Sequence, residues 1–372
     1  MATSWVILGR ILRAEEETRS VPVVLPARVT VLSAGHSMHP DPSLPDKYPY
    51  IIAAGPLCLL ANFAVAPSIG ACFSDFPHGT SLALVRNFHR AQGQSQITAS
   101  LERVPDRPGH VPAIFNIGGV GLISDDEGGY TIAELQFPTG IDSETATLVC
   151  FRSDNHQWYS QEVGNPLPEE ERGWFPHGAV SIDGTIWWFD LTWGIISCDP
   201  SAMQPSALFH GLPDDRALDI ETVFMFSKRC ITVSQSQLRY VEIVHEAATV
   251  SMWTRIMGPD GWHWDQKYVM SFQEIWNDHS YREAGLRPIV PDLALVSPLD
   301  ANLVYFALHQ CLFCANVPDH RVVHYEDHEP VNMTGRPPLV GRFVLPWSLP
   351  QAVAPGAAGI TRLIPAGVSN SI

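Results

Sequence analysis

The chain has 372 residues, of which 45% are hydrophobic and 17% are charged, and its formal net charge at pH 7 is −16. A negative field repels the phosphate backbone of nucleic acids, whose binding requires clustered Lys and Arg, and it opposes docking on anionic membrane surfaces. We therefore expect neither nucleic acid nor membrane among the partners. The 27 Gly and 31 Pro are spread along the sequence, which is typical of short β-strands separated by many turns.

The N-terminal segment 1–13 contains one short apolar run, Trp5–Leu8, and lacks the pattern of a secretory signal. The seven Cys are neither dense nor even in number, which favours free thiols in a reducing compartment. We therefore expect an intracellular protein, cytoplasmic or nuclear, that is not secreted.

The stretch 51–73 carries no charge and is long enough to span a bilayer. Gly and Pro interrupt it and leave pieces of strand length over 51–54 and 57–65. We therefore expect a buried pair of strands in this stretch, and not a membrane span.

A pattern of four short β-type runs recurs along the chain. In the segment 175–215, the pair Asp183-Gly184 lies between two apolar runs and predicts a tight hairpin. The second strands of successive copies begin near 130, 186, 238 and 303. Their spacing of about 50 to 65 residues is close to the period of kelch-type propeller blades. The copies occupy 40–95 (weak), 111–165, 175–215, 220–270 and 290–330.

These copies predict an all-β fold, a β-propeller of roughly five to six four-stranded blades in a single domain over 1–350. Strands from the two ends of the chain could complete a sixth blade. Ser271 and Glu274 have the spacing of a capping box, and Gly285 stands where a helix would stop, so we expect a short helical insertion over 272–284. The tail 351–372 is rich in Ala, Gly and Pro, and we expect it to be disordered.

Several of these runs resemble a plant family, expanded in grasses, that is called domain of unknown function 1618. The runs that carry the resemblance are Leu148-Val-Cys-Phe-Arg-Ser153, Trp187-Trp-Phe-Asp-Leu191, Leu238-Arg-Tyr-Val-Glu-Ile243, Val250-Ser-Met-Trp253 and Val304-Tyr-Phe306. The resemblance covers most of the chain and supplies no catalytic motif.

The blade sequences are also similar to the kelch-like propeller domains of F-box proteins, which present substrates to ubiquitin ligases. The Pro-rich segment 1–50 lacks the amphipathic periodicity of an F-box. This resemblance therefore implies a relative of such adaptors without an F-box.

Three motifs suggest chemistry that their context does not support. Cys311 and Cys314 have the spacing of a zinc or redox pair, but no second pair completes a metal site, so we expect structural thiols. The glycines of 118–121 and the acidic run 125–129 lack a phosphate-binding pattern, and we expect turns there. The His-rich group, which also contains the tripeptide of J-domain co-chaperones, is more typical of loop or surface residues than of metal ligands; it comprises His36, His39, Asp41 and His78.

The eleven Trp include two close pairs that could line a ligand groove or pack between blades. Trp187 and Trp188 are adjacent in sequence, so they point to opposite faces of their strand. Both can be buried only if that strand is covered on both faces. Trp262 and Trp264 alternate and share one face.

From the sequence we assign no catalytic, cofactor-binding or metal-binding residue, and we expect no cofactor. The first hypothesis is a non-enzymatic propeller scaffold that binds a protein or peptide partner, because a repeat scaffold is present without a recognisable catalytic constellation. A second hypothesis is an enzyme, such as a hydrolase or a carbohydrate-active protein, that uses the central channel and gathers carboxylates or His there. A third is an F-box-less relative of ubiquitin-ligase substrate adaptors.

Overall fold

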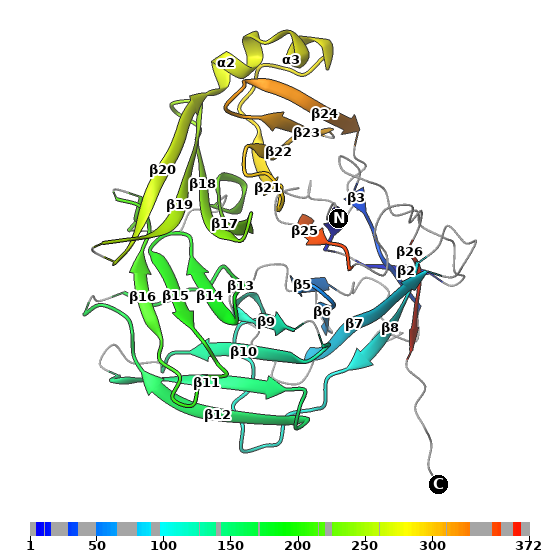
Figure 1. The fold of residues 1–372 in the computed structure, drawn as a ribbon, viewed down its shortest axis with the longest axis vertical. Coiled ribbons are helices and arrows are strands. Elements are labelled where there is room, and N and C mark those ends of the chain that lie inside the picture. Colours follow the sequence, from blue (N-terminus) through cyan, green and yellow to red (C-terminus); the bar gives the residue numbers. More distant parts are fainter. Residues whose placement is uncertain are drawn as a thin grey trace.

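The computed structural model describes residues 5–10, 12–15, 29–35, 50–64, 80–90, 97–125, 127–138, 143–169, 172–214, 216–219, 225–259, 261–309, 311–327, 344–350 and 360–365. These residues form a six-bladed β-propeller (Figure 1). The prediction of an all-β propeller is therefore confirmed.

Five blades follow one another along the chain, and each begins with its inner strand and ends with its outer strand. Blade 1 contains β5 (Tyr50–Ala54), β6 (Leu59–Ala64), β7 (Thr80–Arg90) and β8 (Ile97–Arg103); blade 2 contains β9 (Gly121–Ser124), β10 (Tyr130–Gln136), β11 (Thr145–Arg152) and β12 (Gln157–Gly164); blade 3 contains β13 (Gly178–Ile182), β14 (Thr185–Asp190), β15 (Gly194–Cys198) and β16 (Leu208–Gly211); blade 4 contains β17 (Arg229–Ser234), β18 (Gln237–Val244), β19 (Thr249–Gly258) and β20 (Gly261–Ser271); blade 5 contains β21 (Asp292–Val296), β22 (Leu303–Leu308), β23 (Cys311–Asn316) and β24 (Arg321–Asp327).

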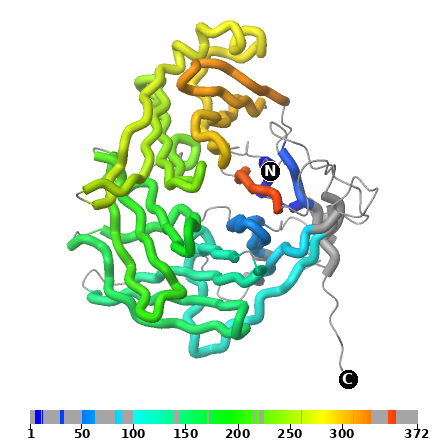
Figure 2. Tube along the Cα trace, viewed as in Figure 1, coloured from blue at the N-terminus to red at the C-terminus, as the bar shows by residue number. Residues whose placement is uncertain are grey.

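The sixth blade joins the two ends of the chain and closes the ring. It consists of β25 (Val344–Ser348), β1 (Trp5–Gly9) and β3 (Val29–Thr30). β1 pairs antiparallel with β25 and parallel with β3, and Figure 2 shows the blue N-terminal strand beside the red-orange β25. Beside this blade, β2 (Arg13–Glu15) and β4 (Ser33–Gly35) form a separate parallel pair. Strands from the two ends therefore complete the blade that the sequence left open.

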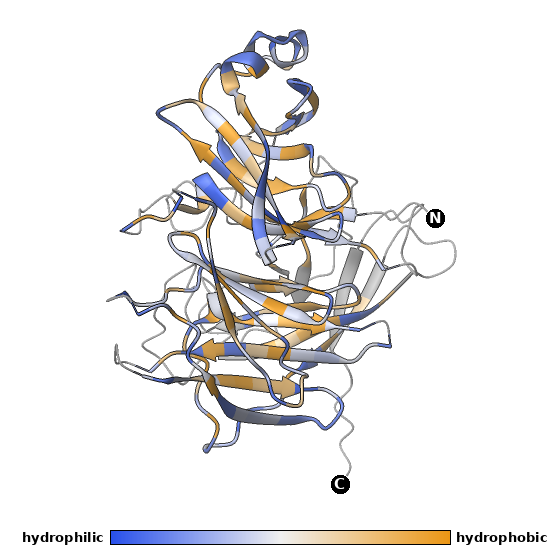
Figure 3. Ribbon diagram, turned by 60° about the vertical axis from the view of Figure 1, so that its left-hand side comes forward, coloured by the Kyte–Doolittle hydropathy of each residue, from blue (hydrophilic) through white to orange (hydrophobic). Residues whose placement is uncertain are grey.

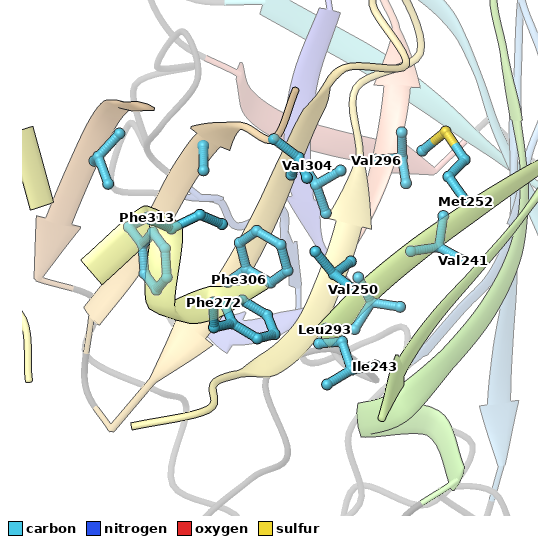
Figure 4. Packing of buried hydrophobic residues seen from close by; sticks show 14 of the residues in the cluster. Val241, Ile243, Val250, Met252, Phe272, Leu293, Val296, Val304, Phe306 and Phe313 are labelled. Carbon is cyan, nitrogen blue, oxygen red and sulfur yellow. The ribbon is translucent and has the colours of Figure 1, made fainter. Parts of the chain in front are cut away.

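The blades pack face to face because each sheet has two apolar faces. Ile132 and Ala133 are neighbours on β10, yet Ile132 packs toward blade 1 and Ala133 toward blade 3. Six clusters of buried side chains occupy the six interfaces between adjacent blades. Figure 3 shows the resulting hydrophobic bands along the stacked sheets. Figure 4 shows the interface of blades 4 and 5, where Val250 and Met252 of β19 lie near Leu293, Val296 and Val304.

A short helical insertion joins blade 4 to blade 5, as the capping-box pattern predicted. Ser271 accepts a hydrogen bond from the backbone N–H of Gln273, and Glu274 accepts one from that of Ser271. The insertion is two helices and not one, α2 (Phe272–Asn277) and α3 (His279–Glu283). Asp278 lies between them in an extended conformation and caps α3, so the chain turns where a single helix was expected. A further single turn, α1 (Met225–Lys228), precedes β17.

The tight hairpin expected at Asp183-Gly184 is present. Ile182 pairs with Thr185, and the two loop residues have φ values of 48° and 76°, as the turn that matches the twist of β-hairpins requires. The uncharged stretch also forms strands, β5 and β6, whose described core residues are buried. No helix in the described part of the chain is long and apolar enough to cross a membrane.

Two segments differ from the sequence-based boundaries. The outer strand of blade 1, β8, lies beyond the range 40–95 expected for that blade. Within the tail expected to be disordered, residues 360–365 form β26 (Ile360–Pro365), which pairs in parallel with β8. Pairing of two backbones so distant in sequence depends on tertiary structure, so the composition of the tail alone did not reveal it.

Candidate functional site

A pocket of about 720 Å³ lies between the outer strands of blades 3 and 4. β19 and β20 form the longest hairpin of the described blades, and its tip reaches toward β16 in Figure 1. Blade 3 contributes the end of β16 and the segment after it. The lining residues are Phe209, His210, Gly211, Leu212, Pro213, Asp214, Arg216, Trp253, Arg255, Trp262, His263, Trp264 and Gln266.

Alternation along the hairpin places its aromatic and cationic side chains on one wall of the pocket. Trp253 and Arg255 are two residues apart on β19, so they share a face. Their cross-strand partners on β20 are Gln266 and Trp264. The Nε1–H of Trp264 donates to the carbonyl oxygen of Gly211 at 2.8 Å. This bond ties the hairpin of blade 4 to the outer strand of blade 3.

Arg255 is the most deeply placed cation of this wall and is only 8% exposed. Its Nη2 donates to Nδ1 of His210 at 2.9 Å, and its guanidinium lies 5.4 Å from the centre of the Trp264 ring. Its Nε has no hydrogen-bond partner among the described residues. Burial lowers the pKa of Arg255 to about 10, so the group still carries its charge at neutral pH.

His210 and Ser197 form a pair that resembles a catalytic dyad, with 3.0 Å between Nε2 and Oγ. Burial, followed by the charge of Arg255, lowers the pKa of His210 to about 4, so the ring is neutral near pH 7. A guanidinium only donates hydrogen bonds, so Nδ1 of His210 accepts and the ring proton resides on Nε2. That nitrogen therefore donates to Ser197 and cannot take its proton, as a general base must.

The second cation of the pocket, Arg216, is already paired. Its guanidinium stacks over Trp253 at 5.3 Å, and its Nη1 lies 3.3 Å from Oε2 of Glu242. Glu242 also contacts Nη2 of Arg229 at 2.5 Å. Of the two guanidiniums that line the pocket, Arg255 is therefore the one without a carboxylate partner among the described residues.

The inner strands around the central axis carry little ionisable chemistry. Across the described inner strands, β5, β9, β13, β17, β21 and β25, the charged residues are Arg229 and Asp292. Arg229 is paired with Glu242. Burial raises the pKa of Asp292. These strands do not bring together the several carboxylates or His on which the channel-enzyme hypothesis depends.

The two cysteines of the expected thiol pair point to opposite faces of β23. Cys311 packs with the cluster between blades 4 and 5, and Cys314 with the cluster between blades 5 and 6. Both are free thiols. Among the residues with described positions, no group of three or more His, Cys, Asp or Glu is arranged to hold a metal ion.

The other sequence motifs have structural places or lie outside the described residues. Asp125 accepts hydrogen bonds from the backbone N–H of Glu127 and Gly129 and so shapes the β9–β10 turn, as expected. The glycines before it belong to the short 3₁₀ turn Ile117–Gly119 and the start of β9. The candidates His36, His39, Asp41 and His78 lie outside the described residues.

The two tryptophan pairs have different roles. Trp187 and Trp188 are both buried and pack on opposite faces of β14, toward blades 4 and 2 respectively. Trp262 and Trp264 instead line the pocket, and Trp262 is 47% exposed. Arg255, His210 and Ser197 were missed from the sequence. The one available signal was Arg255 itself, a charged residue in a buried strand.

Comparison with solved structures finds weak similarities. AztD from Citrobacter koseri is 10% identical with a TM-score of 0.38, over 90% of this chain and 84% of AztD. Sqt1 from Saccharomyces cerevisiae is 11% identical with a TM-score of 0.35, over 78% of this chain and 65% of Sqt1. The Trypanosoma rangeli sialidase is 11% identical with a TM-score of 0.32, over 71% of this chain and 42% of the sialidase. These likenesses are too weak to bear on function.

Sequence comparison yields a family and no individual relative. No curated protein matches the sequence. Residues 188–305 match the model of the family described as "Protein of unknown function (DUF1618)". The matched segment runs from β14 to β22 and includes every residue that lines the pocket. Residues 188–305 therefore match the DUF1618 family, the family that the sequence resemblance named.

Proposed function

We propose that this protein is a non-enzymatic scaffold that binds a protein or peptide partner in the pocket between blades 3 and 4. The observation that carries the proposal is the wall of three tryptophans, Trp253, Trp262 and Trp264, in an open pocket. Trp and Arg are the residue types most enriched among the energetically dominant contacts of protein interfaces.

The exposed ring of Trp262 lies at the tip of the β19–β20 hairpin, where a partner can reach it. Its cross-strand neighbour Met257 is also exposed. Two large apolar side chains presented together at a hairpin tip favour burial against another surface. The pocket therefore offers an anchor inside and an apolar contact at its mouth.

The chemistry beside the tryptophans supports binding in preference to catalysis. The dyad-like pair of His210 and Ser197 has its proton on the wrong nitrogen for base catalysis, because Arg255 donates to the other nitrogen. Groups that are fixed in hydrogen bonds and do not exchange protons near neutral pH suit recognition.

An intracellular location belongs to the same proposal. Six cysteines are free thiols among the described residues, which suits a reducing compartment. Burial raises the pKa of Cys58 to about 11 and that of Cys150 to about 12, so these thiols are unreactive at neutral pH.

Selection from a displayed library of random peptides tests the proposed function. The wild-type protein is expected to enrich related sequences, and the exposed substitution Trp262→Ala is expected to weaken their binding at least ~30-fold, the cost of a ~2 kcal/mol anchor residue. Tyr325→Ala, which removes an exposed aromatic side chain from β24, is the matched control and should leave binding unchanged. Equal loss in both variants, or enrichment of no sequence, would contradict the proposal.

A further inference from the structure

The charge of Arg255 is buried and lacks a balancing carboxylate among the described residues. Burying a charge costs several kcal/mol unless an opposite charge or a set of hydrogen bonds offsets that cost. Here the guanidinium makes one side-chain hydrogen bond, to His210, and its Nε is left without a partner in the described residues. A well-packed strand position could hold an apolar residue at lower cost, so the cation calls for another explanation.

The neighbours of Arg255 hold the guanidinium in place without neutralising it. The face of the Trp264 ring attracts a cation through its quadrupole. His210 is neutral and offers one lone pair. The guanidinium is thus oriented on one side. Its Nε is enclosed without an acceptor among the described residues, and the terminal N–H groups that do not bind His210 remain for a ligand, since the side chain lines the pocket.

We propose that the pocket contains a carboxylate-binding subsite centred on Arg255, with the surrounding tryptophans contacting an apolar group that carries the carboxylate. This inference rests on the proposed function, since it takes the same pocket and adds the chemistry of its ligand. The terminal N–H groups of the guanidinium that do not bind His210 donate to the carboxylate oxygens. Trp253, Trp262 and Trp264 supply the apolar surface.

Charge favours a carboxylate over a phosphate group. One guanidinium matches one negative charge, whereas a phosphate monoester carries ~1.5 to 2 charges at neutral pH and draws several cationic donors. The other pocket cation, Arg216, is engaged by Glu242. Asp214 adds an exposed carboxylate to the lining, and the whole chain carries −16; both oppose a dianion more than a monoanion.

The carboxylate can come from two sources, an acidic side chain of a peptide or a free carboxylic acid with an apolar body. The probes are phenylpropionate, its neutral amide, phenylphosphonate, and two peptides that differ only in Glu or Gln beside a Phe. Binding is followed through the indole N–H signals of the tryptophans in NMR spectra. Each probe is titrated into the wild type, into Arg255→Gln, and into Arg282→Gln, which removes an exposed arginine from α3.

Phenylpropionate is expected to shift the indole signals of Trp253, Trp262 and Trp264 and to bind at least ~10-fold more tightly than its amide, as a charge-assisted hydrogen bond implies. Arg255→Gln is expected to abolish that preference, and Arg282→Gln to leave it unchanged. Phenylphosphonate is expected to bind more weakly than phenylpropionate. Equal binding of acid and amide to the wild type, or an acid preference that survives Arg255→Gln, would overturn the subsite.

Comparison of the peptides with phenylpropionate separates this inference from the proposed function. Preference for the Glu peptide over the Gln peptide supports the subsite with a peptide as its source. Preference for phenylpropionate over its amide without binding of either peptide supports the subsite with a free acid as its source and removes the peptide function. If the Glu and Gln peptides bind equally well, and Arg255→Gln does not weaken their binding, the scaffold function stands and the subsite is overturned. Arg255→Lys keeps the positive charge and shows whether the charge alone supports binding. Thermal unfolding of each variant shows whether the fold is intact.

Discussion

Blade 4 buries Arg229 and Arg255 to almost the same extent and surrounds them differently. Arg229 is 7% exposed and Arg255 is 8% exposed. Arg229 contacts the carboxylate of Glu242 and donates to the carbonyl oxygens of Leu191 and Arg216. Arg255 has one hydrogen bond, to His210, and an unpartnered Nε among the described residues. The first arginine is satisfied within the fold, whereas the second keeps hydrogen-bond donors that no described residue accepts.

A third buried arginine of the same blade shows that a carboxylate is not the only way to satisfy a guanidinium. Arg239 donates from Nη1 to Thr254 and from Nη2 to the side-chain oxygens of Gln235 and Gln237. Neutral acceptors thus occupy both of its terminal nitrogens. The Nε of Arg239 is unpartnered among the described residues, as is that of Arg255. Arg255 differs in having one hydrogen bond from its terminal nitrogens, to His210, and a place on the pocket wall.

The largest expected effect is a loss of stability on replacement of Arg229, the arginine that is paired with Glu242. Arg229→Met leaves the buried carboxylate of Glu242 with the longer contact to Arg216 as its remaining ion pair among the described residues, so we expect the free energy of unfolding to fall by about 3–5 kcal/mol. Denaturant unfolding measures the loss. The double substitution Arg229→Met with Glu242→Met removes both charges and should recover much of the stability. A loss below about 1 kcal/mol in the single variant would mean that Arg229 is no better satisfied than Arg255.

A smaller loss of stability is expected at the wall of the pocket. Trp264→Phe removes the hydrogen bond to the carbonyl oxygen of Gly211 and weakens the stacking under Arg255. The free energy of unfolding should fall by about 1 kcal/mol, the typical value of one such hydrogen bond. The same denaturant titration measures it. A loss as large as that of Arg229→Met would show that Trp264 supports the blade interface more than the pocket.

Removing the unsatisfied cation should change stability little. Arg255→Met relieves the burial of a charge but leaves Nδ1 of His210 without its donor. These effects oppose each other, and we expect the free energy of unfolding to change by less than about 1 kcal/mol. Comparison of Arg255→Met with Arg229→Met is the sharpest contrast between the two sites. A loss of 3 kcal/mol or more, the range of a broken buried pair, would remove that contrast.

The smallest effect is a change in titration. The pKa of His210 is about 4 in the folded protein, below its ordinary value of 6.5, first through burial and then through Arg255. The unfolded chain therefore binds more protons between these pH values, and stability is expected to rise from pH 4 to 6.5 and to level off above. In Arg255→Met the pKa should rise yet stay below 6.5, because burial remains. NMR titration of the His210 ring measures it, and an unchanged pKa would contradict the contact with Arg255.

Of the two arginine environments, that of Arg229 depends on local pairing, which a sequence pattern can predict. Arg229 and Glu242 are cross-strand partners in the β17–β18 hairpin, so their contact follows once the turn between the strands is placed. The cross-strand partner of Arg255 is Trp264, and its hydrogen-bond partner His210 comes from another blade. Contacts between blades depend on how sheets stack, and no spacing along one strand encodes them.

The same distinction explains the fold-level results. Period, turn residues and alternation predicted the β-propeller and the position of the capping box, because these signals lie within one blade or one turn. The sixth blade pairs β1 with β25, and β26 pairs with β8. Both pairings join segments far apart in sequence. Strand pattern can suggest that such segments are β-structure but cannot name their partners.

The most direct test of the account is a crystal structure of the protein with bromophenylpropionate, whose bromine atom is located by anomalous scattering. The account predicts the carboxylate within hydrogen-bond distance of the terminal nitrogens of the Arg255 guanidinium, and the brominated ring against the tryptophans of the pocket. A ligand bound elsewhere on the propeller, or one in the pocket whose carboxylate points away from Arg255, would contradict it.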